Sequence, residues 1–286
     1  MSSAKMFEAE GLAHAIVYCQ ELLKQDGQLI HTEKWQGVDI KQKPEMAMYE
    51  VSHISFSSPV SINGTPNIIA LQQNVQPNLP WAEDHFLERV AGDPLNPGNE
   101  WRNWPWSNSA DKFRMYDNQF SHTYMERYWP TYAGYLPGGY ADYDELEEQE
   151  AEVRKGVRFD YGDLNDVISL IKREPLTRQA YLPVWFPEDT GVKFGGRVPC
   201  TIGYHFLMRN GEMDITYWIR SCDFMRHFKD DIYLTVRLLY WVLEQLAAKD
   251  RRWLAVKPGK LIMHIGSLHL FRNDYIQLFG GESENK

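Results

Sequence analysis

The chain has little cysteine, and its three cysteines form no recognisable pairing or metal-binding motif. Cys19, Cys200 and Cys222 are an odd number of thiols at wide spacing. This excludes a disulfide framework and a zinc-type ligand pattern. Free thiols are typical of a reducing compartment, so we expect a cytoplasmic protein.

Long apolar runs are also missing. No stretch approaches the roughly 20 apolar residues of a membrane span. The best candidate, 232–248, is interrupted by Arg237 and Glu244. The first 25 residues lack the basic start and apolar centre of a signal peptide. We therefore expect neither membrane insertion nor export.

Positive charge is in short supply, with 30 Lys and Arg against 39 Asp and Glu and a net charge of −9. This balance argues against broad binding to nucleic acid or anionic membranes. A glycine-rich phosphate loop and histidines at metal-ligand spacing are absent as well, so we predict no metal. A nucleotide ligand would need a local basic pocket inside an acidic protein.

The composition that remains is that of a packed globular protein, with 43% hydrophobic residues and 14% aromatics. We find no internal repeat and no linker, which predicts one domain over 1–286. Alternation and spacing of apolar residues predict one α+β domain. Expected helices are 1–25, 80–90, 163–173 and 232–248; expected strands are 28–40, 49–56, 179–186, 200–208, 213–220 and 260–270.

Two tight turns and two unusual segments complete this map. Asn63-Gly64 and Asn210-Gly211 are typical hairpin turns, and the acidic run 142–152 is interpreted as a solvated helix face. The segment 92–107 is rich in Pro, Gly, Asn and Trp, and long ordered loops of this kind are often functional. Its tryptophans Trp101, Trp104 and Trp106 either wall a site for flat rings or pack the loop down.

The most informative residues lie between Arg197 and Phe271. Val198-Pro199-Cys200-Thr201 is followed by Arg220-Ser221-Cys222-Asp223, by Phe228-Lys229-Asp230-Asp231, and by Gly266-Ser267-Leu268-His269. This order and spacing resemble the thymidylate synthase superfamily, and within it the phage-type deoxycytidylate hydroxymethylases. The resemblance covers roughly 83–274. It implies a large mixed sheet flanked by helices, with two such sheets packed back to back in a homodimer.

The resemblance makes Cys200 the nucleophile that adds to carbon 6 of a pyrimidine. A buried cysteine is usually an inert small hydrophobe, and the surrounding pattern is what argues for chemistry here. A neighbouring guanidinium lowers a thiol pKa toward the thiolate range. Thr201 follows the cysteine, as in the hydroxymethylases, where thymidylate synthases commonly have histidine.

Arg220 and Ser221 match the family's phosphate grip, since arginine offers a planar fork and serine adds a donor. Taken alone, an Arg-Ser pair is more often part of a surface ion pair. Arg178 matches the first of two adjacent arginines that reach across the family dimer to the neighbour's phosphate. Gln179 replaces the second arginine, so we expect weaker or re-routed phosphate binding.

Asp231 is the residue that selects the base. Uracil-specific members have asparagine at this position, whereas a carboxylate accepts from the amino group of cytosine. A pocket built to hydrogen-bond one edge rejects the other by roughly 10⁴-fold. The alternative is that Asp230 and Asp231 only favour a helix dipole, which we prefer for Asp230.

Four further residues take roles from the resemblance. His269 matches the histidine that contacts the sugar hydroxyl, although a histidine in an apolar strand is often ordinary core. Two residues later Phe271 replaces the family tyrosine, which leaves deoxyribose and ribose both open. Tyr124 resembles the active-site tyrosine, and Asp223 the carboxylate that contacts the folate pterin.

Glu83 resembles the proton-relay carboxylate, in a Glu-x-x-aromatic helix, with Glu88 as the competing candidate. The catalytic set is then Cys200, Glu83 and Tyr124, with dCMP (or CMP or dUMP) and methylenetetrahydrofolate as the bound partners.

The implied reaction is folate-dependent transfer of a one-carbon unit to carbon 5 of a cytidine monophosphate, giving 5-hydroxymethyl-dCMP. Within the superfamily, methylation of dCMP and methylation or hydroxymethylation of dUMP remain open. The polar tail 280–286 lacks the short apolar end that excludes water in thymidylate synthases, which favours hydroxymethylation. Two alternatives of other classes are a cysteine hydrolase that uses Cys200 and a catalytically silent member of the superfamily that acts as a binding protein.

Overall fold

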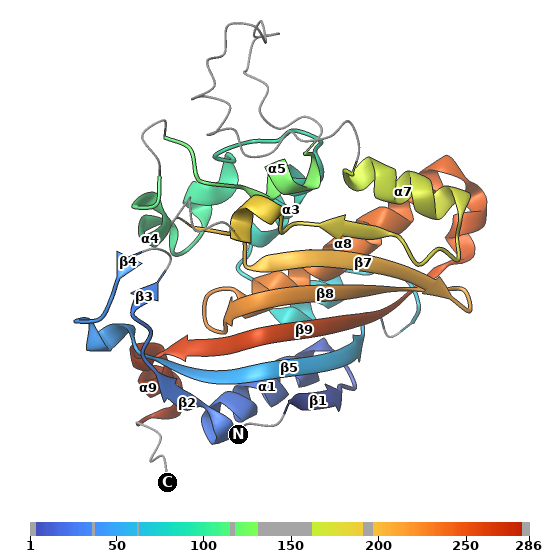
Figure 1. Ribbon diagram of the computed structural model, residues 1–286. Helices are drawn as coiled ribbons and strands as arrows, with labels where there is room; N and C mark the ends of the chain where they lie inside the picture. The colour runs from blue at the N-terminus through green and yellow to red at the C-terminus, as the bar shows by residue number, and fades with distance from the viewer. Residues whose placement is uncertain are drawn as a thin grey trace, which may run out of the picture.

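The computed structural model describes residues 4–35, 38–61, 63–114, 118–130, 162–190 and 197–281. Within these ranges the chain is α+β, with a large mixed sheet and helices packed on it, as the sequence predicts. Figure 1 shows the long strands side by side at the centre of the molecule. The acidic run 142–152 and the last residues of the polar tail, 282–286, lie outside the described residues.

The described strands form one seven-stranded sheet in the order β1-β5-β9-β8-β7-β6, with β2 paired to β5. Their bounds are β1 Lys5–Glu8, β2 Gln28–Ile30, β5 Met48–Pro59, β6 Tyr181–Pro183, β7 Thr201–Arg209, β8 Glu212–Asp223 and β9 Lys257–Phe271. The β1–β5 and β8–β9 pairs are parallel, and the others are antiparallel. Two short strands, β3 Lys34–Trp35 and β4 Val38–Asp39, pair separately.

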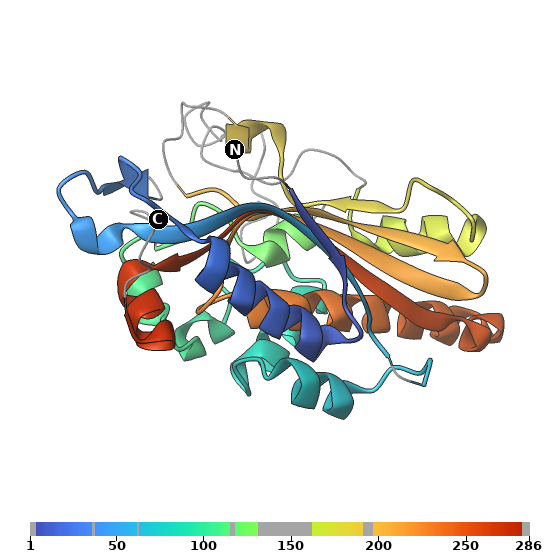
Figure 2. The ribbon, with the colours of Figure 1, turned by 90° about the horizontal axis from the view of Figure 1, so that it is seen from below.

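One face of the sheet is covered by helices. Figure 2 shows α1, α2 and α8 together on this side. The helices are α1 Leu12–Asp26, α2 Ile68–Val75, α3 Trp81–Val90, α4 Ser107–Asp111, α5 Tyr124–Tyr128, α7 Leu164–Arg173, α8 Phe228–Lys249 and α9 Arg272–Phe279. Short 3-10 turns lie at Pro44–Met46, Glu100–Asn103, Pro187–Thr190 and Arg251–Ala255.

Helix α8 is the central element of the core. Its residues 232–240 are all buried, because the helix lies on β8 and β9 and is covered in turn by α2 and α3. A helix that is apolar on every side is stable in water only when neighbours cover it. None of the helices in the described ranges is long and apolar enough to cross a membrane.

Local sequence explains several elements directly. The side chain of Asp163 accepts from Asp166 N at 3.1 Å, and that residue's carboxylate bonds back to the backbone of Asp163, forming a capping box ahead of α7. Asn210 and Gly211 have φ of 51° and 77° and join β7 to β8. Positive φ at both positions is the hairpin geometry that Asn-Gly favours. The helix predicted at 163–173 and this hairpin are confirmed.

Four predictions near the N-terminus need correction. Residues 5–8 form strand β1 and not the start of a helix, because they pair with the long strand β5. The strand predicted over 28–40 is broken into β2, β3 and β4, and that predicted over 49–56 runs longer, from Met48 to Pro59. Gly64 does have a positive φ of 68°, but the turn connects β5 to α2 and makes no hairpin.

Element lengths in the second half also differ from the prediction. Strand β8 continues to Asp223, so Arg220 and Ser221 lie inside a strand and not at its end. Helix α8 begins at Phe228, which places Asp230 and Asp231 in its first turn. Of the strand predicted over 179–186, Tyr181–Pro183 form strand β6, and backbone hydrogen bonds to β7 extend from Ala180 to Trp185.

The other face of the sheet presents half-buried rings. The rings of Trp218 and His264 stack with centroids 5.5 Å apart, and His264 hydrogen-bonds the hydroxyl of Ser55 at 2.9 Å. Near this face's edge, Ile202 and Tyr181 are 39% and 38% exposed. This face therefore carries apolar and aromatic surface opposite the helical layer.

Candidate active site

The predicted site residues meet where three strand ends and one helix start come together. Parallel pairing of β8 with β9 puts Ser221 beside Ser267 and Asp223 beside His269. The backbone N–H of Arg220 donates to the carbonyl of Cys200 at 2.9 Å. The structure thus brings the segments containing Cys200, Arg220, Ser221, Asp223 and His269 to one end of the sheet.

Cys200 lies half-buried immediately before β7. The side chain of Arg220 turns toward this segment, donating from Nε to the carbonyl of Pro199 at 2.9 Å and from Nη2 to that of Val198 at 3.2 Å. The pKa of the Cys200 thiol is raised, mainly by burial, and the charges of Arg220 and Arg197 oppose that rise. The two guanidinium groups therefore favour the thiolate at this position.

Asp231 reaches the same region from the first turn of α8. Its Oδ2 accepts from the thiol of Cys222 at 3.5 Å and its Oδ1 from the hydroxyl of Tyr217 at 3.4 Å. Burial raises the pKa of Asp231 to about 7, despite the opposing charge of Arg89. By contrast, Asp230 accepts from the backbone and side chain of Asn78, so it ties α8 to the segment before α3.

Three hydroxyl groups extend the hydrogen bonds of Asp231. Tyr217 lies 2.9 Å from the hydroxyl of Thr201, either oxygen being able to donate. The hydroxyl of Thr201 lies 3.1 Å from that of Tyr124. A continuous row of oxygens therefore joins Asp231 to Tyr124.

Arg89 is a site residue that the sequence analysis missed. It is 5% exposed, and its guanidinium lies 4.1 Å from the ring centroid of Tyr124. Its Nε has no hydrogen-bond partner within the described residues. A buried arginine is costly unless it meets an anion or a ligand. Its place on the apolar face of α3, one turn after His85 and Phe86, was the available sequence clue.

His269 and Asp223 are both buried at this end of the sheet. Burial lowers the pKa of His269, with the charges of Asp223 and Glu50 opposing that shift. The imidazole is therefore neutral near pH 7 and has both a donor and an acceptor nitrogen.

Asp223 has a visible structural task. Its Oδ1 accepts from the backbone N–H groups of Met225 and Arg226, and its Oδ2 from Nη1 of Arg226, each at 3.0 Å. These bonds fix the turn that leads from β8 into α8.

Glu83 is engaged away from these groups. Its two oxygens accept from Arg237 at 2.9 Å each, and Oε2 also accepts from the hydroxyl of Tyr233 at 2.6 Å. Tyr233 in turn accepts from Gln72 of α2. The carboxylate therefore joins α2, α3 and α8. The competing Glu88 is buried, with its Oε2 3.5 Å from Nδ1 of His85. Its Oε1 accepts from the backbone N–H of Asn99.

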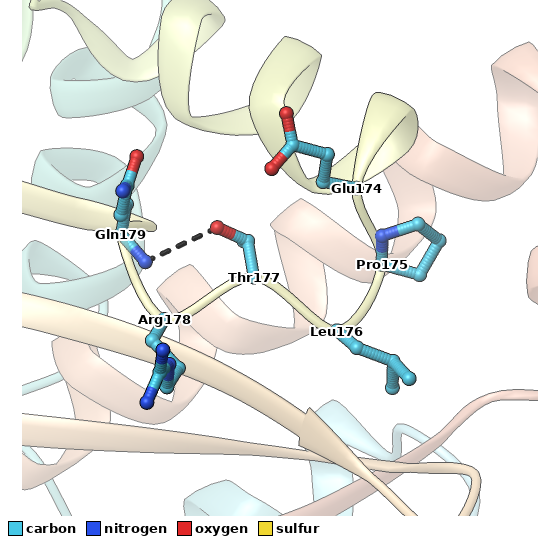
Figure 3. Close-up of a pocket in the computed structure, with 6 residues that line it drawn as sticks. All are labelled: Glu174, Pro175, Leu176, Thr177, Arg178 and Gln179. Atoms are coloured by element: carbon cyan, nitrogen blue, oxygen red, sulfur yellow. Dashed lines mark hydrogen bonds between the residues drawn. The ribbon is translucent and has the colours of Figure 1, made fainter.

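Arg178 does not join the Cys200 cluster of its own chain. It is exposed on the loop 174–179, which surrounds an open hollow (Figure 3). Its carbonyl accepts from His205, five residues along from Cys200. At about 3.3 Å per strand residue this is a separation of roughly 16 Å. In Figure 3 the side chain points away from that of Gln179.

Aromatic rings line the approach to α8. Trp104 stacks on His227 with centroids 4.9 Å apart and packs 6.1 Å from Trp81. Both indole nitrogens are buried without a partner among the described residues. Trp101 instead packs edge-on against Phe120. The loop tryptophans therefore have different roles. Trp101 packs the loop, whereas Trp104 has an indole N–H donor without a partner among the described residues.

The described residues contain no group of three metal-ligating side chains close enough to hold an ion. The residues that sequence reasoning missed are Arg89, Arg197 and Tyr217. Tyr217 occupies an inward position of the alternating strand β8, where every second residue faces α8. Nothing local separated this tyrosine from ordinary core.

Comparison with known proteins agrees with this geometry. The family description "Thymidylate synthase" matches residues 80–279. The chain belongs to the thymidylate synthase family. The resemblance inferred from the motifs is confirmed.

Individual relatives are distant. A thymidylate synthase from Enterobacteria phage T4 is 28% identical over 117 residues, covering 40% of this chain and 37% of that protein. A deoxyuridylate hydroxymethyltransferase from Bacillus phage SP01 is 30% identical over 113 residues, covering 39% and 28%. A bifunctional dihydrofolate reductase-thymidylate synthase from Zea mays is 29% identical over 113 residues, covering 40% and 20%. The matched segment spans less than half of each relative.

Proposed function

We propose that the protein transfers a one-carbon unit from methylenetetrahydrofolate to carbon 5 of a cytidine monophosphate, as a dCMP hydroxymethyltransferase. The proposal rests on Asp231, whose carboxylate lies in the first turn of α8 near Cys222 and Tyr217. The resemblance matches this residue to the asparagine of uracil-specific members. A carboxylate accepts from the amino group of cytosine and offers no donor to the carbonyl of uracil when ionised.

In the proposed reaction the thiolate of Cys200 adds to carbon 6 of the base, which makes carbon 5 nucleophilic. Methylenetetrahydrofolate supplies the one-carbon unit that carbon 5 receives, and loss of the carbon 5 proton and of tetrahydrofolate leaves an exocyclic methylene. Water adds to this methylene to give the hydroxymethyl group, and the Cys200 thiolate is eliminated from carbon 6. Arg220 and Arg197 favour the thiolate before addition. Asp231 holds the amino edge of the ring, which fixes the ring over the sulfur.

Phosphate and sugar contacts follow from the same cluster. Arg220 and Ser221 lie on β8 beside Cys200, at the place where the phosphate grip is expected. The exposed Arg178 lies far from its own Cys200, as a side chain that serves a neighbouring protomer would. We therefore propose a homodimer packed through the bare face of the sheet, which carries Trp218 and His264. Phe271 follows His269 without a hydroxyl, so CMP is tested beside dCMP.

The folate site is supported by unpaired donors. The buried indole nitrogen of Trp104 has no hydrogen-bond partner among the described residues. The indole ring itself stacks on the imidazole ring of His227. A flat heterocycle with carbonyl and ring nitrogen acceptors satisfies such a donor. Asp223, by contrast, already holds three hydrogen bonds from Met225 and Arg226. Its contact to the pterin would have to use remaining lone pairs.

The product is proposed to carry a hydroxymethyl group because Thr201, and not histidine, follows the nucleophile. The Bacillus phage relative whose name is deoxyuridylate hydroxymethyltransferase supports hydroxymethyl chemistry in the family. A specific observation favours dUMP as a second substrate. Burial raises the pKa of Asp231 to about 7, and the protonated carboxyl donates to the uracil carbonyl.

The experiment is to incubate the protein with methylenetetrahydrofolate and dCMP, dUMP or CMP, and to weigh the products by mass spectrometry. We expect dCMP to gain a hydroxymethyl group at pH 8, with Cys200→Ala inactive. Asp231→Asn should move the preference toward dUMP by at least about 10²-fold. A gain for dUMP alone in the wild type would overturn the assignment of Asp231, and a methyl product would overturn the hydroxymethyl branch.

A further inference from the structure

The row of hydroxyl groups between Asp231 and Tyr124 is not needed to build the sheet, yet it is continuous and sheltered. Thr201 is 1% exposed and Tyr217 is fully buried. The oxygen–oxygen distances along the row are 3.4 Å from Asp231 to Tyr217, 2.9 Å to Thr201 and 3.1 Å to Tyr124. Both ends of the row belong to residues that the proposed function places at the nucleotide.

The order of protons in such a row depends on the charge at its end. Each hydroxyl has one proton to donate. When Asp231 is ionised, Tyr217 donates to it and Thr201 donates to Tyr217. Tyr124 must then donate to Thr201, which reverses the direction found in the structure, where Thr201 Oγ1 donates to Tyr124. When Asp231 is protonated, it donates to Tyr217, Tyr217 donates to Thr201, and Thr201 donates to Tyr124. Hydrogen bonds in a chain strengthen one another when all point the same way.

We propose that Thr201 and Tyr217 are positioning residues that, with Tyr124, hold the carboxyl group of Asp231 toward the base and pass one proton between Asp231 and Tyr124. The inference rests on the proposed function for its ligand. The transfer is balanced: a proton arriving on the oxygen of Tyr124 displaces that tyrosine's own proton to Thr201, then Thr201's to Tyr217, and Tyr217's to the carboxylate. No bond other than O–H bonds forms or breaks.

Several charged and titratable groups surround Asp231 besides this row. They are Arg89 from α3, Cys222 from β8, Asp230 from the same helix, and Cys200 from the segment before β7. Arg89 is the cation among them, and its guanidinium lies on the ring of Tyr124. The row therefore lies between one buried cation and one buried carboxyl group. The charge of Arg89 opposes the rise that burial causes in the pKa of Asp231.

The test measures the pKa of Asp231 in the ligand-free protein by NMR of ¹³C-labelled aspartate, the signal being assigned by its loss in Asp231→Asn. Tyr217→Phe removes a donor to the ionised form, so we expect the pKa to rise by about 0.5–1 unit. Thr201→Val should raise it less, and Thr201→Ser, which keeps the hydroxyl, should restore the wild-type value.

The matched control is Tyr204→Phe. Tyr204 is buried and stacks on Tyr217 with centroids 5.0 Å apart, but it is not a member of the row. This variant loses a neighbouring tyrosine hydroxyl and should leave the pKa of Asp231 unchanged. A merely structural role for Tyr217 predicts equal effects in the two tyrosine variants.

The same shift should appear in the pH profile of kcat/KM for dCMP, with the rising limb moved to higher pH in Tyr217→Phe. If Tyr217→Phe fails to fold, Thr201→Val against Thr201→Ser decides the matter. An unchanged pKa of Asp231 in folded Thr201→Val and Tyr217→Phe overturns the proposal. A shifted pKa in a protein that modifies no nucleotide would support the row while refuting the proposed function, so the two failures are distinguishable.

Discussion

The ion pair between Glu83 and Arg237 offers a direct test of what Glu83 does. The side chain of Arg237 is 5% exposed and that of Glu83 is 23% exposed. Two parallel N–H···O bonds of 2.9 Å join them, and Tyr233 adds a third donor. Glu83→Gln removes the charge but keeps the size, so it tests the pair with little loss of packing.

Breaking a buried pair from one side costs about 3–5 kcal/mol, since the remaining charge is left uncompensated. Glutamine retains one carbonyl acceptor, and Glu83 is partly solvated. We therefore expect Glu83→Gln to lower the free energy of unfolding by about 2 kcal/mol. Burial raises the pKa of Glu83, but the hydrogen bonds and charge of Arg237, with the Tyr233 bond, give a net lowering. Because the pKa of Glu83 is lower in the folded state, its charge stabilises the fold at pH values above the unfolded pKa of about 4.3. This contribution to the free energy of unfolding is lost as the pH falls through the folded-state pKa.

The assay is urea unfolding followed by circular dichroism at neutral pH and again near about pH 4, where the difference between wild type and variant should shrink. The control is Asp84→Asn, an exposed carboxylate in the same helical turn, which should cost about 0.5 kcal/mol or less. Turnover per folded molecule is measured in parallel. Unchanged stability in Glu83→Gln together with a loss of turnover would refute the structural assignment and restore the proton-relay hypothesis.

Three further outcomes follow from the buried groups. Arg127 forms a bidentate pair with Asp189 at 2.8 and 2.9 Å, and both side chains are at most 2% exposed. Arg127→Met should therefore lower the free energy of unfolding by about 3–5 kcal/mol. A loss below about 1 kcal/mol in chemical denaturation would contradict this. Arg220→Gln should slow alkylation of Cys200 by iodoacetamide at neutral pH, because the thiol pKa rises when that charge is lost; equal rates would show that Arg220 does not act on the sulfur. Because the pKa of Asp231 is about 7, kcat/KM for dCMP should increase as pH rises through about 7, and a profile flat from about pH 6 to about pH 8 would refute the need for an ionised carboxylate.

The sequence predicts best where local chemistry decides the structure. The α7 helix follows from its capping residue and from apolar residues spaced three and four apart, all of which are buried. The β7–β8 hairpin follows from Asn210-Gly211, since few other pairs accept positive φ at both positions. The cluster around Cys200 was predicted from the resemblance of its motifs to the thymidylate synthase superfamily, and the structure places those motifs on adjacent strands.

Other features depend on distant contacts that no local pattern encodes. Strand β1 exists because β5 offers a parallel edge to residues 5–8. Arg89 and Tyr217 are inward residues on an ordinary amphipathic helix and an ordinary alternating strand. Only the packing of α3 and β8 against the start of α8 shows that they face Asp231. Glu83 matched a family pattern by spacing, yet the face of α3 on which it lies turns it toward Arg237.

The position of Asp231 explains why these unforeseen residues belong to the site. An asparagine at the first turn of α8 would be neutral and would need only hydrogen-bond partners. A carboxylate at the same place must be desolvated, which is unfavourable unless donors and a cation compensate. The structure supplies two neutral donors, Tyr217 and Cys222, and one buried cation, Arg89. Under the proposed function, the choice of base would depend on this whole environment, because exchange of the single side chain leaves the buried guanidinium without its counter-charge.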